Sequence, residues 1–290
     1  MTVVSLSDIQ IRDPFVVPVA EESAYYLFGS TDADIWSGPG TGFDCYRSTD
    51  LIEWTGPIEA FRPPPGFWAQ TNFWAPEVHR VDDAWFMFAT FTTDAGHRGT
   101  AVLRAAEVHG PYEQWSEGAV TPPAWPCLDG TLHVDGSDRW LVFCHEFIQC
   151  GDGEICAVRL TDDLREAVGE PVLLFRASEA PWSTVFGTTD AGDPQHVTDG
   201  PFLHRGPDGA LLMLWSSYGE QGYAMGVARS PSGSLLGPWE QDDRPIWAED
   251  GGHGMVFRTF DGQLHLALHQ PNASPLERAV LVPFADGLRR

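Results

Sequence analysis

One two-strand unit recurs five times along the chain, and this repetition constrains the fold more than any other feature. Each unit has a distinctive leading residue, an apolar strand, a polar turn and a second apolar or aromatic strand. The units read DPFVVPVAEESAYYLFGS from Asp13, APEVHRVDDAWFMFAT from Ala75, DGTLHVDGSDRWLVFCHE from Asp129, DGPFLHRGPDGALLMLWSS from Asp199 and HGMVFRTFDGQLHLALHQ from His253. Subtraction of these numbers places their starts 62, 54, 70 and 54 residues apart. Helical periodicity is scarce between them.

Further strands follow these units, as in GFDCYRSTDLIEWTG and GYAMGVARSPSGSLLGPWEQ, so that one period holds about four strands. A β-sandwich would show shorter and more even spacing. The sequence therefore predicts an all-β fold, a five-bladed β-propeller with four-stranded blades around a central axis. No linker divides the chain, and residues 1–290 are expected to form a single domain.

Propeller geometry predicts which side chains meet at one mouth of the axial tunnel. The first strand of each blade lines the axis, and the antiparallel second strand ends beside the point where the first began. We therefore expect one mouth to be lined by the five leading residues, Asp13, Ala75, Asp129, Asp199 and His253. The ends of the second strands add Asp32, Thr92, His145, Glu146, Tyr218 and His269.

Three of the five leading residues are aspartates. Asp-Pro and Asp-Gly are common turn starters, which is the structural explanation for any one of them. Three carboxylates in register favour a chemical explanation, because glycoside hydrolysis needs an acid and a base whose pKa values differ. A third carboxylate can raise the pKa of the acid by repulsion, and Arg12 can lower the pKa of Asp13.

Charge and segment composition exclude several classes of partner. The formal charge is 17 − 41 = −24, which repels nucleic acid and anionic membranes. No stretch has the roughly 18 apolar residues of a membrane helix, and the N-terminus MTVVSLSDIQ shows no signal-peptide pattern. Five cysteines, an odd number without metal-ligand spacing, favour reduced thiols. A cytoplasmic location is therefore expected.

Six motifs in order along the chain carry a resemblance to a known family: RDPFVV, FWAPEVH, LDGTLHVD, TDGPFLHR, LMLWSS and GGHGMVF. They resemble glycoside hydrolase family 43, inverting five-bladed propellers that act on arabinosides, xylosides and related sugars. The resemblance extends from about residue 9 to about residue 284. It implies that Asp13 is the general base and that Asp129 tunes and orients the acid.

The chain departs from the family pattern at the general acid. That residue is normally Glu before Gly-Pro, and here it is Asp199. A carboxyl set back by one methylene is costly, because misplacement by about 1 Å can reduce a rate on the order of 100-fold. Three alternatives follow: Asp199 donates the proton to a more deeply bound sugar, Glu146 donates it instead, or the protein is a weak hydrolase or sugar-binding relic.

The remaining candidates concern substrate and ion binding. Sugars stack on aromatic faces, and Trp74 and Phe43 are the preferred candidates for stacking among the rim aromatics Trp36, Phe43, Trp74, Phe147, Trp182, Trp215 and Tyr218. Asp32, His145, Tyr218 and His253 are further expected substrate-binding residues, and His145, His196 and His269 are candidates for hydrogen bonds to sugar hydroxyls. The resemblance also implies a calcium or other ion on the axis, coordinated by water near His253, although a lone histidine there is equally explained by hydrogen bonding.

Together these observations predict an inverting, exo-acting hydrolase of pentose-containing oligosaccharides. The resemblance favours α-L-arabinofuranosides, including arabinan or arabinoxylan oligosaccharides, over β-D-xylosides, and a galactoside or galactofuranoside hydrolase is a further alternative. A carbohydrate-binding propeller without turnover predicts sugar affinity without hydrolysis, and a scaffold propeller would have no use for axial carboxylates. Phosphorolysis would need a cationic pocket, and a total of 17 Lys and Arg residues leaves few side chains to form one. A small oligosaccharide is the expected partner, and no oligomeric state is defined.

Overall fold

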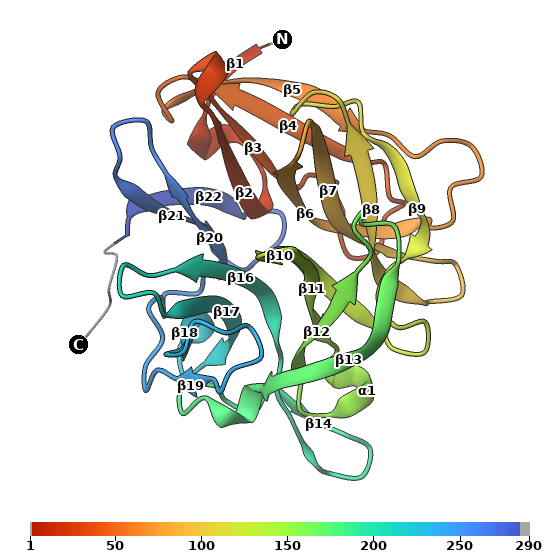
Figure 1. The fold of residues 1–290 in the computed structure, drawn as a ribbon, viewed down its shortest axis with the longest axis vertical. Coiled ribbons are helices and arrows are strands. Elements are labelled where there is room, and N and C mark those ends of the chain that lie inside the picture. The colour runs from red at the N-terminus through yellow and green to blue at the C-terminus, as the bar shows by residue number, and fades with distance from the viewer. Residues whose placement is uncertain (1, 285–290) are drawn as a thin grey trace.

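The computed structural model describes residues 2–284, and almost all of its regular structure is β-strand (Figure 1). Five blades surround a central axis. Their first strands contact one another in a closed ring, and they are β2 (Arg12–Val19), β6 (Thr71–Val81), β10 (Cys127–Asp135), β16 (Asp199–Arg205) and β20 (Gly252–Arg258). The predicted five-bladed propeller is confirmed, while residues 1 and 285–290 of the predicted domain lie outside the described residues. Among those described residues, no helix has the length and apolar character needed to cross a membrane.

The blades follow one another along the chain. Blade 1 contains β2 (Arg12–Val19), β3 (Ala24–Ser30), β4 (Phe43–Ser48) and β5 (Glu53–Phe61), with β1 (Thr2–Ser5) added at its outer edge. Blade 2 contains β6 (Thr71–Val81), β7 (Ala84–Thr92), β8 (Arg98–Ala105) and β9 (Glu113–Ala119). Blade 3 contains β10 (Cys127–Asp135), β11 (Asp138–His145), β12 (Glu154–Leu160) and β13 (Ala167–Arg176). Blade 4 contains β16 (Asp199–Arg205), β17 (Leu211–Gly219), β18 (Gly222–Ser230) and β19 (Glu240–Gln241). Blade 5 contains β20 (Gly252–Arg258), β21 (Leu264–Gln270) and β22 (Arg278–Pro283).

Two elements outside the blades stand near the site described below. The single helical turn α1 (Phe147–Cys150) follows β11, and the short hairpin of β14 (Gly187–Thr188) and β15 (Pro194–Gln195) precedes β16. Single 3₁₀ turns occupy Leu6–Asp8, Ala20–Glu22 and Ala177–Glu179.

Blade 5 has three strands rather than the predicted four, and the N-terminal segment covers its open edge. Gln10 pairs with Arg278 on β22, the N–H of Ile11 donates to the carbonyl of Glu277 at 3.3 Å, and the Arg278 guanidinium donates to the carbonyl of Ser7 at 2.8 Å. The two ends of the described chain therefore close the ring together.

Apolar layers hold the blades face to face. Middle strands such as β7, with the sequence AWFMFATFT, are buried on both faces because each blade is sandwiched between two others, so their sequences read as continuous apolar runs. One buried cluster joins blades 5, 1 and 2, and the other interfaces between neighbouring blades have clusters of their own. Packing between blades, which follows the hydrophobic effect, thus sets the positions of the first strands around the axis.

A residue with a left-handed backbone conformation lies near the start of each first strand. This conformation explains why these strands begin with unusual residues. The φ angles are +54° at Asp13, +47° at Ala75, +57° at Asp129, +52° at Gly200 and +47° at His253. Each coincides with a register shift between the first and second strands of its blade. The shift is a β-bulge, which re-aims the leading side chain toward the mouth.

Blade 4 breaks the predicted register. The ring position there is held by Gly200, and Asp199 lies one residue earlier, opposite Ser216, as Arg12 lies opposite Ser30. A side chain at position 200 could not fit, because a Cβ there would come within 2.7 Å of the His253 ring. The prediction that Asp199 stands in register with Asp13 and Asp129 is therefore wrong, and its carboxyl approaches the mouth from a different direction.

Candidate active site

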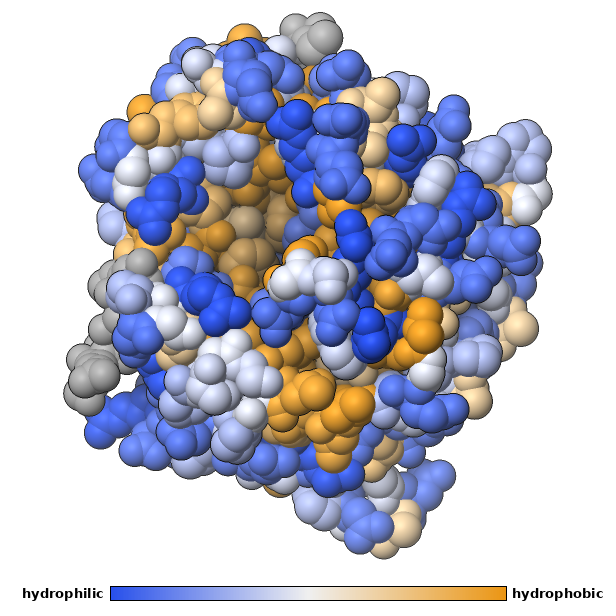
Figure 2. Space-filling view, in the orientation of Figure 1, coloured by the Kyte–Doolittle hydropathy of each residue, from blue (hydrophilic) through white to orange (hydrophobic). Residues whose placement is uncertain are grey.

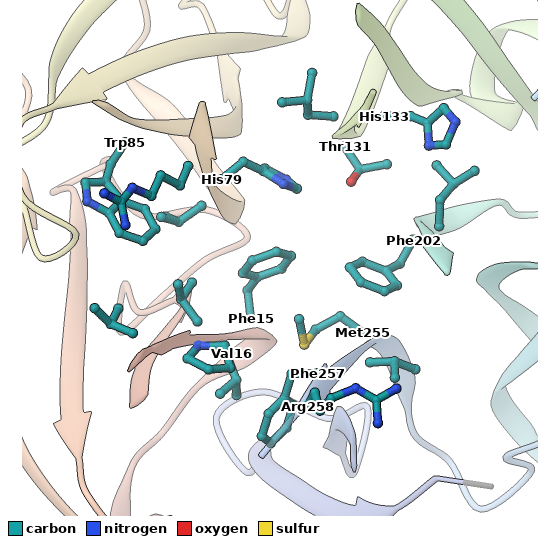
Figure 3. A pocket seen from close by; sticks show the side chains of 18 of the residues that line it. Phe15, Val16, His79, Trp85, Thr131, His133, Phe202, Met255, Phe257 and Arg258 are labelled. Carbon is teal, nitrogen blue, oxygen red and sulfur yellow. The ribbon is translucent and has the colours of Figure 1, made fainter. Parts of the chain in front are cut away.

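Two cavities lie along the propeller axis. One, of about 570 Å³, is lined by the later residues of the first strands, such as Phe15, Phe202 and Met255 (Figure 3). Figure 2 shows the hydrophobic hollow at the centre of the ring. The other, of about 410 Å³, contains the strand-leading residues Asp13, Asp129, Asp199 and His253, and it is the candidate active site.

Asp13 is buried among partners that favour its ionised form. Its carboxylate accepts a hydrogen bond from Ser30 Oγ at 2.7 Å and lies 3.5 Å from Arg12 Nε and 3.1 Å from His253 Nδ1. Burial alone would raise the pKa of Asp13, but attraction from His253 and Arg12 outweighs that effect and holds the pKa below its usual value. The proposed influence of Arg12 on this carboxyl is thus present, and Asp13 is ionised at neutral pH.

Asp129 is buried as well, and its carboxylate lies 3.5 Å from the same His253 Nδ1 that faces Asp13. Burial and repulsion from Asp13 raise the pKa of Asp129 well above its usual value, and the N–H of Gly200, which donates to Oδ2 at 3.0 Å, opposes the rise. This carboxyl therefore resists ionisation unless a donor or a cation faces it.

Asp199 is partly exposed in the pocket, so a substrate can reach it. Tyr223 donates its hydroxyl to Asp199 Oδ2 at 3.0 Å. Burial and repulsion from Asp129 raise the pKa of Asp199 to about 7, although His253 and Arg12 act in the opposite direction. Because burial and Asp129 raise this pKa to about 7, a large share of the molecules keep Asp199 protonated at neutral pH.

A cysteine in blade 3 directs the Gly200 N–H to Asp129. In the four other blades the ring N–H donates to the end of the previous blade's second strand, from Ala75 to Ser30, from Asp129 to Thr90, from His253 to Ser216 and from Asp13 to His269, at 2.8–3.3 Å. The matching residue of blade 3 is Cys144, which pairs with Leu128 as Ser30 pairs with Arg12. Sulfur is a weak acceptor, so Gly200 donates to the carboxylate instead.

Glu146 also lines the pocket, but it is committed to an ion pair. Its carboxylate contacts Arg98 Nη1, and the Arg98 guanidinium also stacks on Trp74, with 4.5 Å from Cζ to the ring centroid. Protonating Glu146 would break this buried pair, which is costly when one partner stays charged. Glu146 is therefore less suited than Asp199 to donate a proton.

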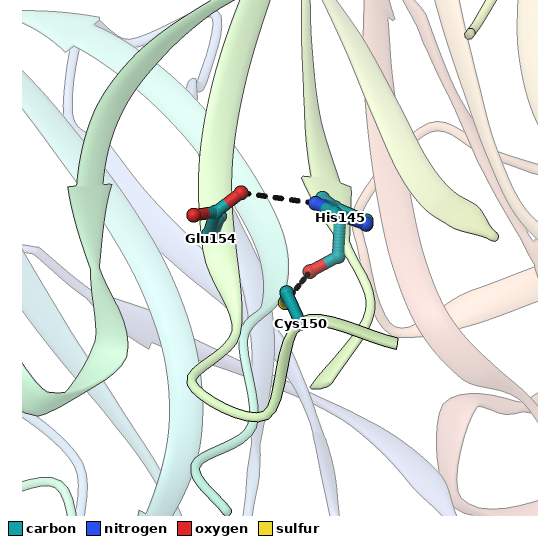
Figure 4. Close-up of side chains that lie close together, drawn as sticks. All are labelled: His145, Cys150 and Glu154. Carbon is teal, nitrogen blue, oxygen red and sulfur yellow. Dashed lines mark hydrogen bonds and ion pairs between the residues drawn. The ribbon is translucent and has the colours of Figure 1, made fainter. Parts of the chain in front are cut away.

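His145 holds the turn that carries Glu146. Nδ1 lies 2.9 Å from Glu154 (Figure 4). Nε2 lies 2.7 Å from Gln149, and the ring stacks on Trp125 at 4.3 Å. With Cys150 these residues form the one group of three possible metal ligands found among residues 2–284. Both ring nitrogens are engaged, and burial raises the pKa of the Cys150 thiol to about 12, so the group acts as a hydrogen-bonded support for α1.

An axial ion near His253 remains a prediction. His253 Nδ1 faces Asp13 and Asp129 at 3.1 and 3.5 Å. Within the described chain, these residues are not among the groups that bring three ligand atoms together. An ion on the axis would accordingly be held by water and by His253, with no cage of protein oxygens.

The other predicted binding residues divide between pocket and core. Trp74 and Tyr218 line the pocket, and the Trp74 indole N–H donates to the carbonyl of Ile35 at 2.6 Å. Asp32 accepts hydrogen bonds from Thr41 and so holds the loop of residues 31–42, but it is not among the residues that line the pocket. Phe43 is fully buried in the cluster of blades 5, 1 and 2, which excludes the predicted stacking on a sugar.

The burial of Phe43 leads to a prediction about stability. Phe43 packs against Phe61, Phe73 and Phe91, with ring centroids 5.9–6.2 Å apart. We expect Phe43→Ala to lower the free energy of unfolding by about 3–5 kcal/mol, the usual cost of a large core cavity, while KM changes less than about twofold. Urea denaturation and steady-state kinetics would measure both. A large rise in KM with unchanged stability would contradict the assignment of Phe43 to the core.

Several site residues escaped sequence reasoning. Arg98 pairs with Thr92 at the mouth end of β7, so hairpin pairing was the signal that could have found it. The same hairpin reasoning could have identified Tyr223, because the tight turn at 219–222 pairs it with Tyr218. Gly252 makes room for Tyr223, since a Cβ at position 252 would lie 2.7 Å from that ring, and no sequence pattern reveals such a contact.

The propeller brings carboxyl groups of different pKa together at one mouth, and such a pair supplies the acid and the base that glycoside hydrolysis requires. The sequence profile described as "Glycosyl hydrolases family 43" matches residues 6–283. The chain belongs to this family, whose members are inverting glycoside hydrolases. It is therefore an enzyme that cleaves an oligosaccharide.

Comparison with solved structures agrees with this family assignment. An endo-arabinase from Bacteroides thetaiotaomicron VPI-5482 is 40% identical, with a TM-score of 0.89 over 97% of this chain and 96% of that one. A thermostable family-43 glycoside hydrolase is 23% identical, with a TM-score of 0.78 over 96% and 91% of the two chains. An α-L-arabinofuranosidase from Lactobacillus brevis is 19% identical, with a TM-score of 0.75 over 97% and 94%, and shows the fold alone. A comparison with curated proteins gave no match.

Proposed function

We propose that the protein is an exo-acting enzyme, which hydrolyses α-L-arabinofuranosides from one end of the sugar chain with inversion at the anomeric carbon. The observation that carries the chemistry is the pair of unlike carboxyls in one pocket, with the pKa of Asp13 lowered and that of Asp199 raised to about 7. The 40% identity to an endo-arabinase supports arabinose as the sugar.

In this proposal each proton has a defined route. Asp13 removes a proton from water, the water oxygen bonds to the anomeric carbon, and the bond from that carbon to the leaving oxygen breaks. The leaving oxygen takes its proton from Asp199, whose pKa is raised to about 7 by burial and by Asp129, and which Tyr223 holds in place. Glu146 fixes Arg98 and Trp74 at the side of the pocket.

Exo-action is supported by the contacts of the loop of residues 31–42. The Trp36 indole N–H donates to Ser274 Oγ of blade 5 at 3.1 Å, and Asn72 of blade 2 donates to the carbonyl of Ile35 at 3.2 Å. The loop thus joins blades 5, 1 and 2 into a continuous rim on one side of the pocket. A sugar chain would enter from the side of blades 3 and 4 and end at this rim.

Product analysis tests the proposal. Linear α-1,5-arabino-oligosaccharides should release arabinose from the first minutes, and the arabinose should appear as the anomer inverted from the α-linkage, as read by proton NMR. A β-D-xylo-oligosaccharide incubated in parallel should react far more slowly. Arabinobiose and arabinotriose as first products would contradict exo-action. Binding of arabino-oligosaccharides without any hydrolysis would mean that the protein is a carbohydrate-binding propeller and not an enzyme.

The same carboxyls predict a bell-shaped pH dependence of kcat/KM. The rate should fall at acid pH, below the usual titration range of an aspartate, where Asp13 with its lowered pKa is finally protonated, and as pH rises through about 7, where Asp199 loses its proton. In Tyr223→Phe the alkaline limb should move to higher pH, because a donor to the ionised Asp199 is lost. A rate that stays constant above pH 9 would be inconsistent with Asp199 as the acid.

A further inference from the structure

The pocket has two chemically different sides. The side formed by blades 1 and 2 contributes Arg12, Asn72, Arg98 and the two tryptophans to the lining. The side formed by α1 and the segment before β16 contributes Phe147, Ile148, Phe186 and Val197, all apolar. The first side can hydrogen-bond sugar hydroxyls, whereas the four side chains of the second side bind by apolar contact, which suits an alkyl or aryl group as well as the apolar face of a sugar.

The apolar side adjoins the proton donor. The N–H of Phe186 donates to the carbonyl of Gln195 at 2.8 Å, which brings Phe186 beside the segment that leads into Asp199. Its ring packs on Tyr218 at 4.6 Å and on Phe147 at 5.5 Å, and Tyr218 in turn contacts Tyr223, the partner of Asp199. The acid stands where the leaving group departs, so the apolar side chains face the leaving group.

These side chains are held exposed. Ile148 is 60% exposed and Phe186 is 49% exposed, although burial would normally be favoured. The turn α1, seen beside β14 in Figure 1, cannot fold Ile148 inward, because His145 and Gln149 fix it and the Gln149 amide donates to the carbonyl of Ala124 at 3.1 Å. Exposed apolar side chains on a fixed support at the edge of a pocket are typical of a binding surface.

We propose that α1 and the β14–β15 hairpin form a binding site that accepts an apolar leaving group, an aryl or alkyl alcohol, in addition to the next sugar of an oligosaccharide. This proposal rests on the function proposed above and specifies the leaving-group side of its substrate. The bonds made and broken are the same as in the hydrolysis described above. The water oxygen bonds to the anomeric carbon as Asp13 takes a proton from the water, the bond from that carbon to the alcohol oxygen breaks, and the departing oxygen takes the proton of Asp199.

The test compares methyl and hexyl α-L-arabinofuranosides, whose leaving alcohols have similar acidity, so that a difference in rate reports binding. We expect wild type to prefer the hexyl glycoside by about tenfold or more in kcat/KM, since each methylene that is fully buried adds about fourfold. In Phe186→Ser and Ile148→Ser the preference should fall to about twofold or less. The matched control Leu236→Ser, which removes a 52% exposed leucine of blade 4 outside the pocket, should retain it. Equal rates for the two glycosides in wild type, or an unchanged preference in both pocket variants, would overturn the proposal.

A second measurement separates this proposal from the choice of sugar. Binding of 4-methylumbelliferone, an aryl alcohol, can be followed by fluorescence without any hydrolysis. If neither arabinofuranoside reacts but the aryl alcohol binds wild type and binds Phe186→Ser at least tenfold more weakly, the sugar assignment fails and the apolar site stands. If the aryl alcohol binds neither protein, the apolar site is refuted whatever the sugar.

Discussion

Asp13→Asn is expected to lower kcat by about 10³–10⁴-fold, the upper part of the range for loss of a general base. Asn is the replacement of choice because it tolerates the left-handed backbone of position 13, where φ is +54°, and can still accept the hydrogen bond of Ser30. The amide cannot take a proton from water, while the substrate keeps its other contacts. KM should therefore change little, and steady-state kinetics on an arabino-oligosaccharide would show the loss in kcat.

Two controls distinguish a missing base from a damaged fold. Azide attacks without needing deprotonation, so it should restore turnover of an activated aryl glycoside by Asp13→Asn and give a glycosyl azide of inverted configuration. Asp135→Asn, at the exposed far end of a first strand, should retain wild-type activity. If azide restores nothing while the variant unfolds at the wild-type urea concentration, Asp13 is not the base.

Asp199→Asn is expected to have the second-largest effect, and that effect should depend on the leaving group. With an oligosaccharide, whose leaving alkoxide needs a proton, kcat/KM should fall by about 10³-fold. With the p-nitrophenyl glycoside, which departs without much acid assistance, the loss should be tenfold or less. The alkaline limb of the pH profile near 7 should also disappear.

Glu146→Gln is the matched comparison. It removes the ion pair with Arg98, so Trp74 loses part of its support. We expect the loss to be about tenfold and equal for both kinds of substrate, because binding is disturbed and proton donation is not. The reverse pattern, with a leaving-group effect in Glu146→Gln and none in Asp199→Asn, would make Glu146 the acid.

The sequence predicted the architecture and the mouth because both depend on periodic patterns. Alternating hairpins placed Asp13, Asp129 and His253 correctly, since each leads a first strand. The position of Asp199 was predicted one residue off, because Asp-Gly and Asp-Pro look alike in sequence while only glycine fits beside His253. Register at a bulge is decided by such tertiary contacts.

Other parts of the site depend on contacts that no local pattern encodes. The strand FDCYRS alternates in polarity, but which face turns inward depends on the neighbouring blade, so Phe43 was misassigned to the rim. The apolar wall arises from α1 and the β14–β15 hairpin, two irregular insertions with no repeat to identify them. Tyr223 reaches Asp199 from a third strand, across space left by Gly252.

The hydrogen bonds that the backbone N–H groups of the leading residues donate all cross a boundary between blades, and this has a consequence for folding. Ala75 depends on Ser30 of blade 1, and His253 depends on Ser216 of blade 4. Asp13 depends on His269 of blade 5, whose Nδ1 accepts its N–H at 3.3 Å. No blade can therefore assemble its share of the site alone. Catalytic competence is a property of the closed ring, and during refolding it should appear in the final step, when the seam between the last blade and the first is sealed.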